Sequence, residues 1–184
     1  MGTQELIQIL EDQETGYFYD VAQELSKRPE EAALIAPVLA KALSYPRRDS
    51  YEAGVFLIGM GEAAKPAIPH LFSNLTHERE VVRQYSALAL GRIGEAAECA
   101  IPVLASLLWD TDPAVRTASA SALKSITRIN VIQEIYNFDP EKPRGIYQDI
   151  PEGNITGSAR EWWKLEGQYI NWSTNSDNCR PKLD

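Results

Sequence analysis

The chain has 184 residues, of which 44% are hydrophobic and 24% are charged, and these values are typical of globular proteins and not of disordered ones. This length suits one domain or a short repeat array with a tail, and it argues against two separate enzyme domains. The 18 basic and 26 acidic residues give a formal net charge of -8, which argues against broad binding to the phosphate backbone of nucleic acids.

The sequence contains no segment that predicts a membrane span or a secretion signal. It has no run of about 18 apolar residues, which a membrane span needs, and residues 1–10 lack a basic region followed by an apolar one. The two cysteines, Cys99 and Cys179, suggest no disulfide framework. We therefore expect a cytoplasmic protein that does not bind membranes.

The chain repeats itself with a fixed period. The segment GEAAKPAIP, which begins at Gly61, returns as GEAAECAIP from Gly94, and about half of the positions in the two copies are identical. A weaker copy precedes them, in which Leu57 is the counterpart of Leu90. A period of about 33 residues is typical of stacked supersecondary units.

Each unit is predicted to consist of two helices. The first helix opens near the Ala-Ile-Pro step, because proline is tolerated in the first turn of a helix. The second helix follows a polar turn, in which Asp112 is placed to accept hydrogen bonds from free amides before Pro113. Gly61 and Gly94 end the second helices, where a left-handed residue causes no strain. The second helices carry an inward stripe formed by Val82, Tyr85, Ala89 and Ile93 and by their counterparts Val115, Ala118, Ala122 and Ile126.

These units resemble the HEAT repeats, in particular the HEAT-like repeats named after phycobilisome lyases. The resemblance covers about residues 30–128 and rests on AIPHL at 67–71, VR at 82–83, ALALGRIG at 87–94, AIPVL at 100–104 and DTDPAVR at 110–116. It implies an all-α fold, a short right-handed α-solenoid of antiparallel helix pairs. Proteins with such arrays include chromophore-lyase subunits, scaffold proteins and DNA-repair glycosylases, and no catalytic residue belongs to the repeat itself.

The repeats have flanks of a different composition. Residues 1–29 predict an N-terminal capping helix pair, and the segment 1–31 holds eight acids and two bases. Residues 129–172 predict a short helix at 131–137, a loop rich in Pro and Gly, and a C-terminal capping helix with Trp162 and Trp163. Residues 173–184 predict a flexible tail.

Arg83 and Arg116 occupy equivalent positions at the start of second helices. We expect them to form a structural ladder with turn acceptors such as Asp110 and Asp112, because a guanidinium makes several directed hydrogen bonds. The alternative is that they bind an anion or an acidic partner.

The second helices of an α-solenoid form an extended concave surface, which is the predicted binding face. This face is apolar near Val55 and Leu88 and basic near Arg92 and Lys124, which suits a protein segment with apolar and acidic residues. The alternative is an ordinary solvated face. Trp109, at the end of a first helix, is added as an aromatic residue of the kind found in binding hot spots. The candidate partner-binding residues are Tyr51, Val55, Gln84, Leu88, Arg92, Trp109, Thr117, Ser121, Lys124 and Arg128.

No set of residues predicts a catalytic, metal or cofactor site. His70 and His77 could share a helix face, but no third ligand has a fixed spacing. Cys99 is more typical of a small buried residue than of a nucleophile, and phosphate-binding loops and catalytic elbows are absent from the sequence. We expect no catalytic residues, no metal and no cofactors.

The leading functional hypothesis is a non-enzymatic module that binds a partner protein along the concave face, as a monomer or in a hetero-complex. A sharper version is a bacterial immunity protein or antitoxin, because small acidic proteins can neutralise basic toxins. The alternative, which the resemblance suggests, is a subunit of a bilin lyase that acts on phycobiliproteins. Nucleic acids and membranes are not expected partners.

Overall fold

The computed structural model describes residues 1–11, 17–45 and 49–127. The predictions that concern Arg128, the C-terminal capping helices and the tail lie outside these residues. Within the described part the elements are helices, and those labelled η are 3-10 helices. In chain order they are α1 (Thr3–Glu11), α2 (Phe18–Ser26), η1 (Pro29–Glu31), α3 (Ala32–Leu43), α4 (Asp49–Met60), η2 (Gly61–Ala67), α5 (Ile68–Asn74), α6 (Glu80–Ile93), η3 (Gly94–Ala100), α7 (Ile101–Ser106), η4 (Leu107–Trp109) and α8 (Pro113–Thr127).

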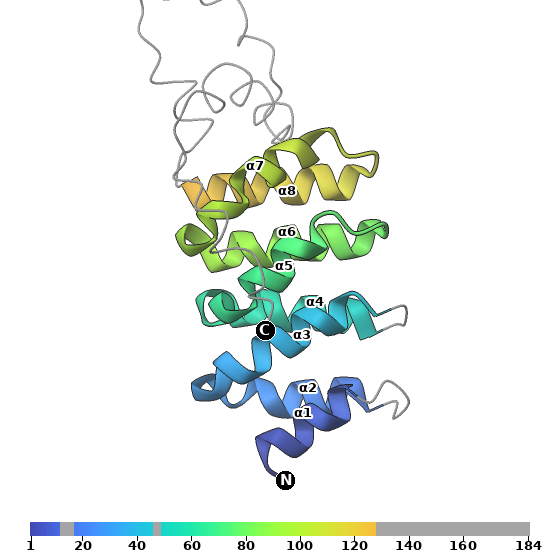
Figure 1. The fold of residues 1–184 in the computed structure, drawn as a ribbon, viewed down its shortest axis with the longest axis vertical. Coiled ribbons are helices and arrows are strands. Elements are labelled where there is room, and N and C mark those ends of the chain that lie inside the picture. Colours follow the sequence, from blue (N-terminus) through green and yellow to red (C-terminus); the bar gives the residue numbers. More distant parts are fainter. Residues whose placement is uncertain (12–16, 46–48, 128–184) are drawn as a thin grey trace, which may run out of the picture.

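The helices pair and stack along the long axis of the molecule, with the N-terminus at one end of the stack (Figure 1). The second helices α2, α4, α6 and α8 each pack on the next in the series, while α1 packs on α3 and α3 on α5. The described part is therefore an all-α solenoid of the HEAT-like kind, as the repeat predicts.

Residues that recur with the period of the sequence are buried at equivalent places in the core. Leu57, Leu90 and Leu123, which occupy equivalent positions of three successive second helices, are 0%, 0% and 1% exposed. Burial of one such side chain contributes roughly 1.5–3 kcal/mol. Because the neighbouring unit supplies much of the covering surface, each helix pair depends on the next for its stability.

Glycine and proline set the helix boundaries of the two clear repeats. Gly61 and Gly94 have positive φ angles of 56° and 79°, which confirms the prediction that left-handed residues end the second helices. Pro69 and Pro102 lie in the first turns of α5 and α7, as the Ala-Ile-Pro step predicts. The structure adds η2 and η3 before these helices, and Ala64 of η2 is fully buried in the core.

Two further predictions about the second helices have different outcomes. Asp112 caps α8 as predicted, since its Oδ1 accepts hydrogen bonds from the amides of Ala114 at 2.8 Å and Val115 at 3.1 Å. Tyr85, which is predicted to belong to the inward stripe, packs against the core but is only half-buried. Its ring lies over Gly54 of α4, where there is no Cβ to exclude it.

The two cysteines of the sequence suggest no disulfide framework, but one of them is disulfide-bonded. Cys99, half-buried in η3, is disulfide-bonded, and the other cysteine of the chain, Cys179, lies outside the described residues. The cysteine content therefore no longer argues for a reducing compartment. None of the described helices is long and apolar enough to cross a bilayer.

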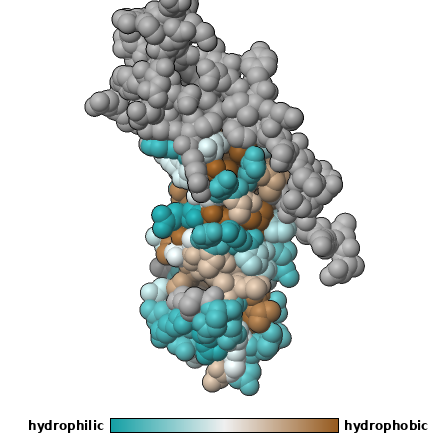
Figure 2. Space-filling model, turned by 90° about the vertical axis from the view of Figure 1, so that its left-hand side faces the viewer, coloured by the Kyte–Doolittle hydropathy of each residue, from teal (hydrophilic) through white to brown (hydrophobic). Residues whose placement is uncertain are grey.

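The surface of the array changes along its axis. Figure 2 views the molecule from the side of the η2 and η3 turns, and it shows hydrophilic residues over the N-terminal end and weakly hydrophobic residues over the middle. The local acidity of the segment 1–31 accounts for part of this difference.

Candidate partner-binding surface

Arg83 holds two consecutive repeats together. Its Nε and Nη2 donate hydrogen bonds to Oδ2 and Oδ1 of Asp110, at 2.8 and 2.9 Å, from α6 to the turn before α8. Its Nη1 donates to the carbonyl oxygens of His77 and Glu78 in its own turn, both at 2.8 Å. The expected structural ladder is present at this position, and both ends of the guanidinium are occupied.

The charges of this pair are stabilised by their contacts. Burial acts to raise the pKa of the Asp110 carboxyl, but hydrogen bonds from the Arg83 side chain and the Asp112 amide outweigh it and hold the pKa below its usual value. The hydrogen bond to Asp110 raises the pKa of Arg83 in turn. A guanidinium so paired is unsuited to binding a further anion.

The preceding interface is joined by a different arginine. Ser50 occupies the position equivalent to Arg83 in the first unit. There Arg79 reaches back from the start of α6, with Nη2 donating to Ser50 Oγ at 2.8 Å and Nη1 to the Tyr45 carbonyl oxygen at 2.5 Å. The predicted ladder of Arg83 and Arg116 does not include Arg79. The counterpart of Arg79 in the next repeat is Asp112, so an arginine at this position does not recur and the repeat pattern does not reveal it.

The second-helix face, which we define as the outward residues of α4, α6 and α8, consists of columns of equivalent positions. One column is Tyr51, Gln84 and Thr117, and the other is Val55, Leu88 and Ser121. Tyr51 and Val55 on α4 are 58% and 45% exposed, whereas Gln84, Leu88 and Ser121 are half-buried and Thr117 is exposed. In both columns the side chain on α8 is thus smaller and more polar than the one on α4.

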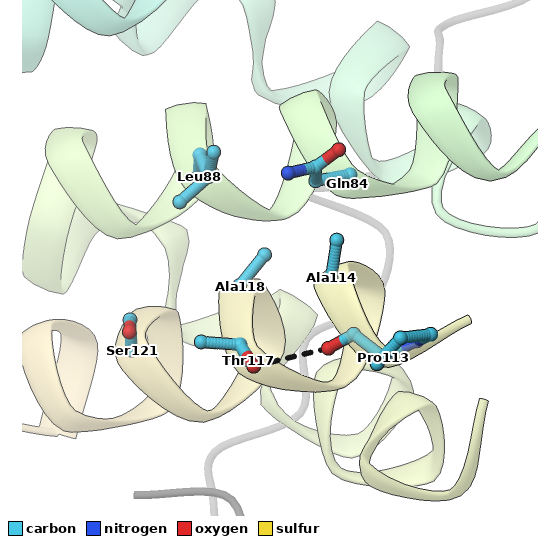
Figure 3. A pocket seen from close by; sticks show the side chains of 7 residues that line it. All are labelled: Gln84, Leu88, Pro113, Ala114, Thr117, Ala118 and Ser121. Carbon is cyan, nitrogen blue, oxygen red and sulfur yellow. Dashed lines mark hydrogen bonds between the residues drawn. The ribbon is translucent and has the colours of Figure 1, made fainter. Parts of the chain in front are cut away.

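A groove of about 360 Å³ lies on this face between α6 and α8 (Figure 3). Gln84 and Leu88 of α6 form one side, and α8 supplies the other residues, among them Ala114 and Ala118. The Thr117 hydroxyl donates to the Pro113 carbonyl oxygen at 3.0 Å and is held against its own helix. The complete lining is Gln84, Leu88, Pro113, Ala114, Thr117, Ala118 and Ser121.

The groove exists because α8 has small residues where α6 has large ones. Ala114 and Ala118 are the counterparts of Val81 and Tyr85. Between α4 and α6 the Tyr85 ring packs edge-on against Tyr51, with ring centroids 5.5 Å apart and planes at 76°, and it fills the space over Gly54. At the next interface the methyl group of Ala118 leaves the corresponding space open.

The predicted site residues are only partly brought together. Gln84, Leu88, Thr117 and Ser121 line the groove, and Tyr51 and Val55 lie on the adjoining helix α4. Trp109 is 47% exposed but belongs to η4 and does not line the groove. Pro113, Ala114 and Ala118 were missed, although the alignment of Tyr85 with Ala118 could have indicated them.

Two cations lie further along the same helices. Arg92 of α6 and Lys124 of α8 are exposed, and neither forms an ion pair with another residue of the described part. An apolar groove with nearby unpaired cations can attract a segment that carries carboxylates, at long range and in a salt-dependent manner.

The two histidines lie in different surroundings. The described residues contain no cluster of three or more metal-ligating side chains. Burial lowers the pKa of His70, with a smaller effect of Lys41 in the same direction. His77 Nδ1 accepts a hydrogen bond from the Arg79 amide at 3.1 Å, so its ring organises a turn.

The comparison with known families agrees with this architecture. Residues 35–124 match the family model of HEAT repeats. No curated protein has a sequence that matches this chain. HEAT repeats are generally protein-interaction modules, and typically scaffolds without catalytic activity. The stacked pairs from α3 to α8, with the arginine contacts that join them, are HEAT repeats.

Proposed function

We propose that this protein is a non-enzymatic module that binds a segment of another protein along its second-helix face, with the groove between α6 and α8 as the central contact. The observation that carries the proposal is the groove, which is lined largely by apolar atoms of small side chains and adjoins the exposed Tyr51 and Val55. Apolar surface of this kind is stabilised when a partner covers it.

The dimensions of the groove favour a few side chains of a protein segment over a buried small molecule. About 360 Å³ lies at the lower end of the range for ligand pockets, and the groove is open along the helices. An apolar side chain of the partner would contact Leu88 and Ala118, while a carboxylate one or two turns away would lie near Arg92 or Lys124. The partner is therefore expected to combine apolar and acidic residues.

The test compares two tryptophan variants of the full chain. Thr117→Trp fills the groove from an exposed position, and Ser106→Trp adds the same side chain to an exposed position of α7. Each variant, with the unsubstituted protein, is used to capture proteins from the source cell, and the captured proteins are identified by mass spectrometry.

The proposal predicts a protein that the unsubstituted chain and Ser106→Trp retain and Thr117→Trp does not. Retention of the same proteins by all three chains would contradict it, because binding would then not use the groove. Thermal unfolding of both variants provides the control for an intact fold.

A role as a bacterial immunity protein or antitoxin is the second candidate. It is supported by the acidic N-terminal unit, in which Glu5, Asp20 and Glu30 are exposed, because opposite charge accelerates association with a basic toxin. A toxin-like reading frame next to the gene, whose product stops growth unless this chain is co-expressed, is the expected result. A lyase role would instead require a change in visible absorbance when the chain is mixed with a bilin and an apo-phycobiliprotein.

A further inference from the structure

The groove between α6 and α8 follows the direction of the two helices (Figure 3). On α6 its lining begins at Gln84, and the cation Arg92 comes eight residues later. The helix rises by roughly 12 Å over this distance, at about 1.5 Å per residue. A bound helix covers the same length with about eight residues, and an extended chain covers it with about four. Since both kinds of segment can reach the cation, the chemistry of the lining discriminates between them.

The groove offers few free polar groups to a bound backbone. The Thr117 hydroxyl donates to the carbonyl oxygen of Pro113 at 3.0 Å, and the amide of Ala114 donates to the capping carboxylate at 2.8 Å. The Gln84 side-chain amide and the Ser121 hydroxyl form no hydrogen bond with the described part of the chain. These two side chains, one on each helix, are therefore the free polar groups of the lining.

A helix suits this lining better than an extended segment does. Each residue other than proline carries one amide and one carbonyl group, so an extended segment of about four residues presents about eight backbone polar groups. Two free side chains pair with only part of them, and a polar group that loses water without a new partner opposes binding. In a helix the backbone groups pair with one another, and an apolar stripe can cover Leu88 and Ala118.

The charges beyond the groove define a second feature of the occupant. Arg92 and Lys124 are exposed, and neither forms an ion pair within the described residues. They follow the last lining residues of their helices, Leu88 and Ser121, by about one turn. Acidic side chains in the adjacent turn of a bound helix would thus lie near both cations.

We propose that the occupant of the groove is an amphipathic α-helix of a partner protein. Its apolar stripe covers the groove, and its acidic residues, one or two turns further along, pair with Arg92 and Lys124. The helical occupant rests on the proposed function, which requires only that some segment of a protein binds there. The helix can therefore be wrong while that function is right, and the experiment separates the two.

The test selects peptides from a displayed library of random sequences on the full chain. The peptides have about 16 residues, which corresponds to roughly 24 Å as a helix. Parallel selections use Thr117→Trp, which fills the groove, and Ser106→Trp, which adds the same side chain to an exposed position of α7. Peptides that the unsubstituted chain and Ser106→Trp retain, and Thr117→Trp does not, bind the groove.

The groove-dependent peptides are expected to have the pattern of an amphipathic helix. Apolar residues should recur at positions i, i+3 and i+4, with an excess of Asp and Glu beyond one end of the apolar stripe. One such peptide is then synthesised and mixed with the full chain. Its helix content, followed by far-UV circular dichroism, should rise on binding.

Charge reversal tests the pairing with the two cations. R92E/K124E is expected to weaken binding of the synthesised peptide about fivefold or more, since two exposed ion pairs become repulsive contacts. A peptide with lysine in place of its acidic residues should bind this variant better than the original peptide does. The matched control K27E/K41E reverses two exposed lysines on other elements and should change the affinity less than about twofold.

Three results would overturn the helical occupant. Groove-dependent peptides with apolar residues at alternate positions, or rich in proline, would show an extended segment and leave the proposed function intact. A selection without any groove-dependent peptide would count against both, and this is also the result when a second copy or the chain itself covers the groove. An affinity that R92E/K124E leaves unchanged would refute the pairing. If that variant unfolds, replacement of the acidic residues of the peptide by glutamine decides the same question on the unsubstituted chain.

Discussion

Replacement of Arg83 by glutamine tests how much one inter-repeat contact stabilises the array. The substitution removes two charge-assisted hydrogen bonds to Asp110, of 2.8 and 2.9 Å, together with the two hydrogen bonds from Nη1 to the turn carbonyls, and it leaves the Asp110 carboxylate 7% exposed without its cation. Hydrogen bonds to charged groups contribute roughly 1.5–3 kcal/mol, and removal of one partner of a fully buried pair costs roughly 3–5 kcal/mol. Since the Arg83 side chain is still 13% exposed, we expect Arg83→Gln to lower the free energy of unfolding by about 2–3 kcal/mol.

The magnitude is measured by a double-mutant cycle with Asp110→Asn. Urea unfolding of the four proteins, followed by far-UV circular dichroism, gives the coupling free energy of the two side chains. We expect the second substitution to cost much less in the presence of the first, with a coupling of about 1.5–3 kcal/mol. Additive effects would refute the argument, because the pair would then contribute nothing beyond what each side chain contributes separately.

The same pair predicts the direction of a pH dependence. The pKa of Asp110 is lower in the folded state than its ordinary value of 3.8. The carboxylate therefore stabilises the fold above the unfolded pKa, and this stabilisation is lost as the pH falls through the folded pKa. Between about pH 6 and pH 3 the unsubstituted protein should lose more free energy of unfolding than Asp110→Asn, and an equal loss would contradict the assignment.

Three further substitutions test the backbone and the packing by thermal unfolding. A Cβ at Gly54 would lie 2.3 Å from Tyr85 Cδ1, so Gly54→Ala should lower the free energy of unfolding by about 1–3 kcal/mol. In a chain that already carries Tyr85→Ala, the same substitution should have little effect. Gly94→Ala adds a Cβ that meets no neighbouring atom, but the residue has a φ of +79°. The free energy of unfolding should therefore fall by about 1–2 kcal/mol through backbone strain alone. An unchanged free energy of unfolding would contradict the left-handed assignment. Asp112→Ala removes the acceptor for two amides of α8 and should cost about 1 kcal/mol, whereas Asp112→Asn should retain most of the stability.

The sequence was sufficient to predict what recurs in the repeats. The helix pairs, the left-handed glycines and the Asp112 cap depend on local rules, and a fixed period applies the same rules at each copy. The contact of Arg83 with Asp110 was also predictable, because both residue types stood at plausible positions of the turn. These features require no knowledge of how neighbouring units are oriented.

The features that the sequence did not predict depend on contacts between non-equivalent positions. Arg79 reaches back to Ser50 because the first unit lacks the arginine that its successor has, and no periodic pattern reveals such a substitution. Tyr85 was assigned to the core by its spacing, but its ring is accommodated over Gly54, on another helix. Helical spacing indicates a direction for each side chain and not the space available there.

The position of the groove follows from these departures from the repeat. Leu57, Leu90 and Leu123 are the same residue in three successive units and are buried in each. The space between two second helices above this core depends on the residues that differ between units. At one interface that space is occupied by Tyr85, and at the next Ala118 lines an open groove. The positions that recur thus carry the fold, and the positions that differ between repeats determine where a partner can be recognised.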